Sequence, residues 1–355
     1  MASILIKNGR LWDGERFLFA DVLTEGSRIS KIGKDIANNA DYTFDAMGKT
    51  VSAGLVDVHV HMQGIAPEAF GIQTEMSSLP FGVTAANDAG SSCGDEALLD
   101  SFAVKTTVFA NSRIISNQID LAFTENLLQK YGSKAIGVKM YFDTTQSGVR
   151  DAAPLRELCR YAHSKGLKVM VHCANSPTPM AEIAESLCAG DILTHIYHGG
   201  ENTCDANDFE AFKIAKSRGV ILDAGFAGHV HTDFHILDRA IRAGFLPDTI
   251  GTDITKRSAY KRGGRYGMTL CMNMAKTACM PEEAIFKAIT SNAAKALGKE
   301  QAWGYLQEGR CADIAVFEEC NEGFDLTDHA GNRLYNNKGF RCVLTVLDGQ
   351  IVYRY

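Results

Sequence analysis

The sequence predicts an α/β protein built on a (β/α)8 TIM barrel, with a small β-sandwich domain formed by both termini. Three observations lead to this prediction. From residue 54 onward, short β-branched runs alternate with longer segments of helical period, which is the pattern of consecutive βα units in a parallel sheet. Eight strand candidates occur in that stretch, as many as a closed barrel needs. The two ends of the chain read instead as alternating strands joined by tight turns, with no helix between them.

The eight strand candidates are short and rich in branched side chains. In chain order they are LVDVHVH, VTAANDAG, TVFANSRII, AIGVKMYFD, KVMVHCAN, DILTHIYHG, VILDAGFAG and DTIGTDIT. Helical stretches lie between them, for example at 154–166, 180–190, 208–219 and 236–244, each ending in the glycine expected just past a helix. An open doubly wound sheet is the alternative topology, but it usually has fewer strands and a glycine-rich phosphate turn after the first, and this chain has no such turn.

The strands at the two ends define the second part of the chain. ILIKNGRLWDG, ADVLTEGSRISKIG and YTFDAMGKTV lie at the start, and CADIAVFEE and CVLTVLDGQIVYRY at the end. Residues 1–53 and 306–355 are therefore expected to form the small β-sandwich domain. Residues 54–305 are expected to form the barrel, inserted between the halves of that domain.

Composition limits the possible partners. The chain has 355 residues, of which 46% are hydrophobic and 22% charged, as in ordinary globular proteins. A formal net charge of -6 gives no basic surface for nucleic acid or an anionic membrane, so neither is expected as a partner. The amino terminus lacks the apolar run of a signal peptide, and no apolar run of membrane-spanning length follows, which predicts a cytoplasmic protein. The ten cysteines include no CxxC pair and are expected to be reduced thiols.

The first strand candidate, LVDVHVH, carries two histidines two residues apart. On a strand, His59 and His61 project from the same face, and so does Asp57. A pair of imidazoles held in this way suits a divalent transition metal. Taken alone, the spacing also fits surface or core histidines, so the pair needs support from other strands.

Further candidate ligands fall on other strand candidates. His172 lies near the C-terminal end of the fifth, His195 is in the sixth and Asp253 in the eighth. Active sites of (β/α)8 barrels are built at the C-terminal ends of the strands, so these residues are expected to converge with the histidine pair on a metal. The alternative for Asp253 is a helix N-cap, which its position among the other candidate ligands makes the less favoured role. Asp88 and Asp223 could orient a ligand or satisfy a loop, and both stay outside the predicted metal set.

Lys139 is a charged residue in the fourth strand candidate, AIGVKMYFD, where a buried strand should have none. Full burial can lower the pKa of a lysine by about 3 to 5 units, so a neutral amine becomes accessible. A neutral amine can add carbon dioxide to give a carbamate, whose two oxygens could each hold one metal of a pair about 3.5 to 4 Å apart. The alternative is a side chain that extends its ammonium group out of the barrel mouth.

The order of these residues resembles that of the binuclear, metal-dependent amidohydrolase superfamily: an HxH pair, a lysine, two histidines and an aspartate on strands one, four, five, six and eight. The segments GVTAANDAGSS, DILTHIYHG, AIRAGFLPDTIGTDIT, SNAAKALG and EGRCADIAVFE are most similar to those of the amidohydrolase/deacetylase metallohydrolases, relatives of dihydroorotase and hydantoinase. The resemblance implies that Lys139 is carboxylated and bridges two divalent metal ions, most often zinc. It further implies that one ion is held by His59, His61 and Asp253, and the other by His172 and His195.

The function implied by the resemblance is metal-dependent hydrolysis of an amide or ester bond. A hydroxide held between the metals would attack the carbonyl, with Asp253 as general base and then general acid. The expected reaction is deacylation of an N-acyl amino acid or an acylated hydroxy acid, and ring opening of a cyclic amide is the alternative. A mononuclear deaminase would not need Lys139, a phosphotriesterase-like hydrolase would lack the flanking β-domain, and a non-catalytic scaffold should have lost ligands. Relatives are commonly oligomers, so a homo-oligomer is expected.

Contacts with substrate are expected from polar residues in or after the strand ends, namely Tyr141, Asn175, His198, Arg113, His229 and His231. A substrate carboxylate would need a donor such as Arg113 or a tyrosine hydroxyl. Relatives carry a GHG-like turn after the seventh strand, whereas this chain reads GFAGHVHTDF, with Phe226 where a histidine is expected. His229 and His231 could take the place of that histidine.

Overall fold

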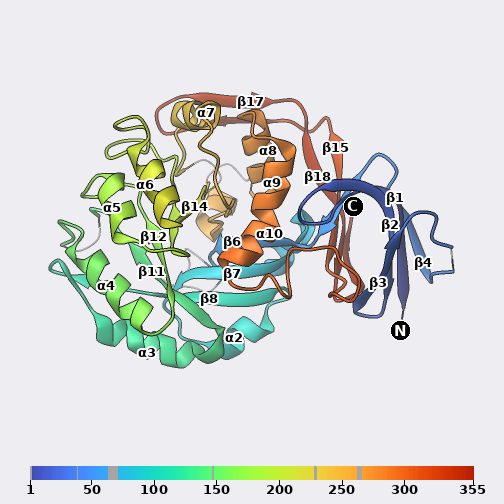
Figure 1. Cartoon of the computed structure of the whole chain (residues 1–355), viewed down its shortest axis with the longest axis horizontal. Coiled ribbons are helices and arrows are strands. Elements are labelled where there is room, and N and C mark those ends of the chain that lie inside the picture. The colour runs from blue at the N-terminus through green and yellow to red at the C-terminus, as the bar shows by residue number, and fades with distance from the viewer. Residues whose placement is uncertain (1, 38, 63–70, 146–147, 228–229, 262–265) are drawn as a thin grey trace.

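The computed structural model describes residues 2–37, 39–62, 71–145, 148–227, 230–261 and 266–355 (Figure 1). Its centre is a curled parallel sheet in which neighbouring strands follow one another along the chain. From one edge to the other the strands are β6 (Leu55–Val60), β7 (Val83–Ser91), β8 (Lys105–Asn111), β11 (Ala135–Tyr141), β12 (Lys168–His172), β13 (Ile192–Thr194) and β14 (Ile221–Asp223). These strands correspond to the first seven predicted ones, so the predicted α/β fold with consecutive parallel strands is confirmed.

The eighth predicted strand takes a different form. Thr249 pairs with Asp223 on β14, and Ile254 pairs with Val60 on β6, in each case through a single parallel bridge. The sheet therefore curls until both of its edge strands contact one segment, residues 249–254. Within this segment Asp253 has a left-handed backbone, with φ of 46°, which a regular strand does not have.

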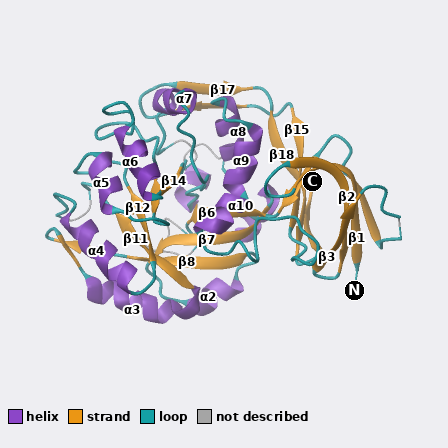
Figure 2. Cartoon of the chain, in the orientation of Figure 1, coloured by secondary structure: helices purple, strands orange, loops and turns teal. Residues whose placement is uncertain are grey.

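Helices follow the strands on the outside of the curled sheet (Figure 2). They are α1 (Thr74–Ser77), α2 (Glu96–Ser101), α3 (Leu121–Tyr131), α4 (Ala153–Ser164), α5 (Met180–Ser186), α6 (Glu210–Arg218), α7 (Phe234–Arg242), α8 (Met268–Thr277), α9 (Glu282–Ile289) and α10 (Ser291–Ala296). The four predicted helices correspond to α4, α5, α6 and α7. α4 shows why such a segment is helical, since Leu155, Leu158, Cys159 and Ala162 recur at helical spacing and are all buried.

Strands from both ends of the chain form a second, mixed sheet. Its order is β19 (Gln350–Arg354), β18 (Gly339–Leu347), β15 (Ile314–Cys320), β5 (Thr50–Ala53), β1 (Ser3–Trp12), β2 (Phe17–Glu25) and β3 (Arg28–Gly33), and β4 (Tyr42–Asp45) also pairs with β1. The two termini meet where β15 pairs antiparallel with β5. The predicted association of both chain ends is therefore present, as hydrogen-bonded strands of one sheet.

Two short hairpins complete the strands that the structure describes. β9 (Ile114–Ile115) pairs with β10 (Gln118–Ile119), and β16 (Phe324–Thr327) pairs with β17 (Arg333–Asn336). The hairpin β16–β17 leaves the terminal sheet after β15 and reaches the region of α7 and α8 (Figure 1). There the carboxylate of Asp328 accepts a hydrogen bond of 2.8 Å from the backbone N–H of Phe234. The hairpin is thereby fixed against the loops that follow the parallel strands.

The core lies on both faces of the parallel sheet. β6 and β7 are buried along their whole length, as strands covered on both faces must be. None of the helices in the described part of the chain is both long enough and apolar enough to cross a membrane.

Candidate metal centre

The six predicted ligands converge at the C-terminal ends of the parallel strands. They come from β6 (His59), β11 (Lys139), β12 (His172), the positions just after β6 and β13 (His61 and His195), and segment 249–254 (Asp253). All six are buried, with exposed fractions between 0% for Lys139 and 7% for Asp253. Charged and ionisable groups are rarely buried together away from solvent unless they are paired or bind an ion.

His59, His61 and Asp253 form the first donor group, whose ligand atoms all lie within 4.8 Å of one another. Oδ1 of Asp253 lies 2.9 Å from Nε2 of His61 and 3.3 Å from Nε2 of His59. One carboxylate oxygen therefore faces both imidazoles. Two ring nitrogens and a carboxylate are a donor set that zinc accepts.

Lys139 lies directly beside this group. Its Nζ is 3.1 Å from Nε2 of His59, and the whole side chain is buried. Burial lowers the pKa of Lys139 to about 8. Gly90, with φ of +93°, makes room for the lysine stem, because a Cβ at that position would lie 2.9 Å from Cγ of Lys139.

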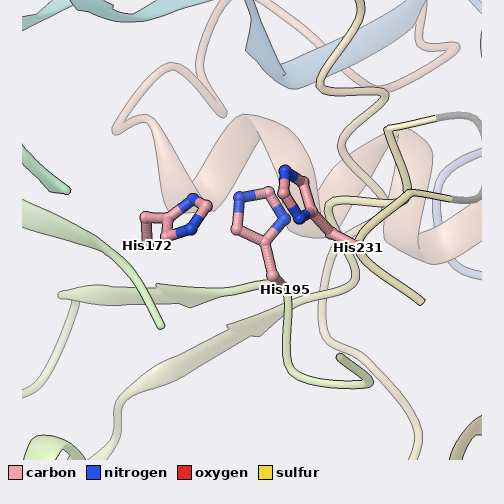
Figure 3. A group of neighbouring side chains, drawn as sticks. All are labelled: His172, His195 and His231. Atoms are coloured by element: carbon pink, nitrogen blue, oxygen red, sulfur yellow. The ribbon is translucent and has the colours of Figure 1, made fainter. Parts of the chain in front are cut away.

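His172, His195 and His231 form the second donor group, and their ligand atoms also lie within 4.8 Å of one another. The three rings lie next to one another in Figure 3, with ring centroids 4.4 Å apart both for His172 and His195 and for His195 and His231. His231 was predicted only as a substrate contact. Its position in a loop gave no periodic signal, so the sequence did not indicate that it joins the two strand histidines.

Asp253 faces both donor groups at once. While Oδ1 points toward the first group, Oδ2 lies 3.7 Å from Nε2 of His231 and 3.9 Å from Nε2 of His195. The rings of His59 and His195 are also close, with centroids 5.1 Å apart. The two donor groups are therefore neighbours on either side of one carboxylate.

Hydrogen bonds behind the rings orient them. Nδ1 of His195 lies 2.7 Å from the carbonyl oxygen of Gly225, which can only accept, so the ring donates from Nδ1 and its Nε2 is the lone-pair nitrogen. Nδ1 of His59 lies 3.0 Å from Oγ1 of Thr194, whose hydroxyl donates to Asp223 over 2.6 Å. Asp223, which is not among the predicted metal ligands, thus acts behind His59 as an orienting carboxylate.

Two of the predicted ligands have strained backbones. His195 has φ of 67° and Asp253 has φ of 46°, in the left-handed region that non-glycine residues rarely adopt. Each such residue costs on the order of 1–3 kcal/mol and persists only where its surroundings hold it. At Asp253 the backbone N–H donates to the carbonyl oxygen of His59 over 2.6 Å. Placing these two side chains therefore lowers the free energy of unfolding of the protein.

The protonation states of the group suit metal binding. Burial lowers the pKa of His59 to about 4 and that of His195 well below its ordinary value, so both rings are neutral near pH 7, the form that ligates metals. Nε2 of His172 has no hydrogen-bond partner in the described segments, although the Asp143 carboxylate lies 3.6 Å away. These buried, lone-pair-bearing donors fit two divalent cations.

Two further carboxylates, those of Asp143 and Asp57, support the site from positions that are not among the predicted ligands. Asp143 lies beside His172 and accepts a hydrogen bond from the side chain of Asn175 over 3.3 Å. Asp57 accepts hydrogen bonds from the backbone N–H (3.1 Å) and the hydroxyl of Thr252 (2.5 Å), which joins β6 to segment 249–254. Asp143 lies two residues after Tyr141, so alternation along the strand predicts that both side chains lie on the same face. This alternation is the sequence signal that could have indicated Asp143 as part of the site.

The predicted substrate contacts have different surroundings. The hydroxyl of Tyr141 and Nε2 of His198 are buried and have no hydrogen-bond partner in the described ranges. Arg113 is half exposed, with its guanidinium hydrogen-bonded to Asp120 over 3.1 Å. His229 lies outside the described residues. Phe226, at the position where a histidine was expected, is fully buried in the core.

A cavity of about 560 Å³ opens beside the second donor group. It brings together residues that follow β12 and β13, the loop around His231 and the tip of hairpin β16–β17. The lining residues are Ala174, Asn175, His198, Gly199, Gly200, Val230, His231, Thr232, Asp233, Asp328, His329 and Ala330. Its position next to the candidate ligands makes it the candidate cavity for a substrate.

Known proteins resemble this chain over nearly its full length. The sequence model of the amidohydrolase family matches residues 50–352. A deacetylase from Enterococcus faecalis is 27% identical, with 98% of each chain covered. A dihydroorotase from Lactobacillus gasseri is 24% identical, covering 100% of this chain and 99% of its own. The crystal structure of a dihydroorotase superposes with a TM-score of 0.87 at 23% identity, over 99% of this chain and 100% of that one.

Proposed function

The chain belongs to the amidohydrolase family and is a metal-dependent hydrolase of carbon–nitrogen bonds, and on that premise we propose that it removes the acyl group from an N-acyl amino acid or an acylated hydroxy acid. The bond cleaved is an amide or a similar ester. The observation that carries the proposal is the buried arrangement of two donor groups around Asp253, with Lys139 beside them. The similarity to a deacetylase over almost the whole chain favours an acyl substrate.

Each donor group is proposed to hold one divalent ion, most simply zinc. His59, His61 and Asp253 would hold one, and His172 and His195 the other, with His231 as a third nitrogen donor. Carbon dioxide is the second cofactor, because the neutral amine of Lys139 would be carboxylated to provide negative charge between the two groups. When bound, two such ions lower the pKa of a water molecule and polarise a carbonyl group.

Asp253 is proposed as the proton carrier of the reaction. Its two oxygens face the two donor groups, so the carboxylate can accept a proton from the attacking water and deliver it to the leaving nitrogen or oxygen. Burial alone would raise the pKa of Asp253, but the neighbouring His59 and His61 outweigh burial and hold it below its ordinary value. The carboxylate is therefore ionised at the start of the cycle, as a general base must be.

The cavity beside the second group is proposed to bind the rest of the substrate. Asn175, His198 and His231 line it and offer polar atoms next to the candidate ligands. Because Nε2 of His198 and the hydroxyl of Tyr141 are buried without hydrogen-bond partners among the described residues, both are available to a substrate's carbonyl or carboxylate oxygens. Arg113 is paired with Asp120, so its part in substrate binding would require that pair to open.

The finer architecture is also part of the proposal. Segment 249–254 would complete an eight-stranded barrel over residues 54–305, which its bridges to β6 and β14 support. Residues 1–53 and 306–355 would form the separate β-sandwich domain, supported by the pairing of β5 with β15. We further propose a cytoplasmic homo-oligomer that acts on a small molecule, without a nucleic acid or membrane partner.

Ring opening of a cyclic amide is the second candidate. It is favoured by the similarity to a dihydroorotase over the full length of both chains, at 24% identity. Both reactions need the same donor groups and the same proton carrier. The shape and polar lining of the cavity therefore determine which of the two substrate types binds.

A substrate screen tests the proposed function. Zinc-loaded protein would be assayed with N-acyl amino acids of both chiralities, O-acylated hydroxy acids, dihydroorotate and hydantoins. The expected result is turnover of the acyl substrates, and loss of that turnover after chelation with recovery on adding zinc. Turnover of only the cyclic compounds would overturn the deacylase proposal, and turnover that survives complete metal removal would overturn the metal-dependent mechanism.

Reactivation of the metal-free protein should depend on pH through Lys139. Its pKa is lowered by burial to about 8, so the fraction of neutral amine falls as the pH drops below that value. At constant dissolved carbon dioxide, the initial rate of reactivation by zinc is expected to fall about tenfold from pH 7 to pH 6. His59, whose pKa is about 4, does not titrate in that range. Equal rates at both pH values would contradict a carboxylated lysine.

A further inference from the structure

A second cluster of metal-ligating side chains lies at the opposite ends of the parallel strands. His163 is in the last turn of α4, and Cys188 and Asp191 lie between α5 and β13. These positions precede the first residues of β12 and β13, whereas the candidate metal centre follows the last ones. The cluster is therefore separate from the proposed catalytic chemistry, on the face of such folds that usually serves stability.

The spacing of the three side chains suits an ion. Their ligand atoms all lie within 4.8 Å of one another. Nε2 of His163 is nearly equidistant from the two carboxylate oxygens of Asp191, at 3.1 Å from Oδ1 and 3.0 Å from Oδ2. Around a tetrahedral zinc ion, nitrogen and oxygen ligands at normal bond lengths are about 3.4 Å apart. The nitrogen–oxygen distance is thus within a few tenths of an ångström of the spacing that the ion needs, and the sulfur of Cys188 lies within 4.8 Å of both atoms.

Asp191 is held in place from behind. The carboxylate is 1% exposed and accepts backbone hydrogen bonds of 2.8 Å from Val169 at Oδ1 and from Cys188 at Oδ2. Each oxygen keeps a second lone pair, and both oxygens face His163. The hydrogen bond from Cys188 also fixes the residue that carries the thiol. This support behind a ligand is what orients donors in established metal sites.

A second thiol lies close by. Cys159 is four residues before His163, on the same face of α4, and is buried. Burial raises the pKa of its thiol to about 12, and the nearby charges of Asp191 and Cys188 add to the effect. The group whose ligand atoms lie within 4.8 Å of one another contains one sulfur, one imidazole and one carboxylate, and Cys159 packs behind it on α4. Sulfur and imidazole donors select zinc and similar soft cations over magnesium or calcium.

We propose that His163, Cys188 and Asp191 form a separate binding site for one zinc ion, which joins the end of α4 to the loop before β13. Cys188 and His163 are partly accessible, so an ion can enter from solvent. A bound ion would stabilise this part of the fold and protect the exposed thiol from oxidation.

Cobalt substitution tests the proposal with a signal that the candidate catalytic centre does not provide. A thiolate bound to Co²⁺ gives a near-ultraviolet charge-transfer band, and no thiol belongs to either catalytic donor group. The wild-type protein loaded with Co²⁺ is expected to show the band, and Cys188→Ser is expected to lose it together with about one metal ion per chain. The matched control is Cys279→Ser, which changes another exposed cysteine far along the chain and should keep the band. A band that persists in Cys188→Ser, or is absent from the wild type, would overturn the proposal.

Protection of the thiol gives a second measurement that does not depend on cobalt. Zinc is expected to slow the reaction of one thiol with a disulfide reagent at least about tenfold in the wild type, and to have no such effect in His163→Gln. The glutamine can still hydrogen-bond to Asp191, so the loop should stay folded. If zinc protects no thiol in the wild type, the cluster is a histidine–aspartate ion pair only, and the proposal fails. Hydrolytic activity should be the same in the wild type and Cys188→Ser.

Discussion

Lys139→Ala is expected to lower the rate of hydrolysis by about a thousandfold and to release metal from the centre. Lys139 is fully buried beside His59, and its carbamate is the proposed source of negative charge between the two donor groups. Without it, two cations would face each other across the Asp253 carboxylate alone. Loss of several kcal/mol of transition-state stabilisation corresponds to a factor of this size. Metal content by elemental analysis and kcat would be measured on the same sample.

Two further measurements make the lysine result specific. Formate or propionate in the buffer is expected to restore part of both metal content and activity, because a small carboxylate can occupy the space of the carbamate. Lys134→Ala is the matched control, since Lys134 lies just before the same strand but pairs with Asp100 at the surface, 2.7 Å away. Full activity of Lys139→Ala would rule out a bridging role for this residue.

Asp253→Asn is expected to reduce kcat by about 10²–10⁴-fold, the usual contribution of a general acid–base group. Asparagine has the same shape and keeps the backbone hydrogen bond to His59, but it cannot accept the proton of the attacking water. Because five other donors remain in the two groups, more metal should be retained than in Lys139→Ala. The measurements are kcat and KM, with metal content and circular dichroism to confirm loading and folding.

Asp248→Asn is the control for this change. Asp248 lies five residues earlier, and its carboxylate accepts a backbone hydrogen bond of 2.9 Å from Leu222, away from both donor groups. Its substitution should lower thermal stability and leave kcat of the folded enzyme close to that of the wild type. A kcat for Asp253→Asn within a factor of about ten of the wild-type value would argue against its role as proton carrier.

Much of the arrangement could be predicted because it follows from strand geometry. Alternation along a strand places His59 and Asp57 on one face, and parallel strands bring their C-terminal ends together. The same rule indicated where His172 and Lys139 would lie without any knowledge of the loops. It also indicated the first seven strands of the curled sheet, which the structure describes at nearly the expected residues.

The remaining features depend on tertiary contacts that have no period in the sequence. His231 reaches the second donor group from a loop, so neither alternation nor helical spacing indicates its position. The eighth strand is reduced to single bridges, and within it Asp253 has a left-handed backbone that strand periodicity does not indicate. The cluster around Asp191 is assembled from a helix end and a turn, two elements whose relative position only the folded chain determines.

The hairpin β16–β17 forms part of the cavity wall, so changes in the hairpin can alter which substrates fit. Residues 328–330 at its tip line the cavity. The hairpin follows β15 of the terminal sheet along the chain and contributes no residue to either donor group. Insertions or substitutions at the tip can therefore reshape the cavity without changing the residues that are proposed to perform the reaction. The part of the cavity wall that the hairpin supplies is separate from the donor groups, so evolution or an engineer can alter that wall while the donor groups are kept.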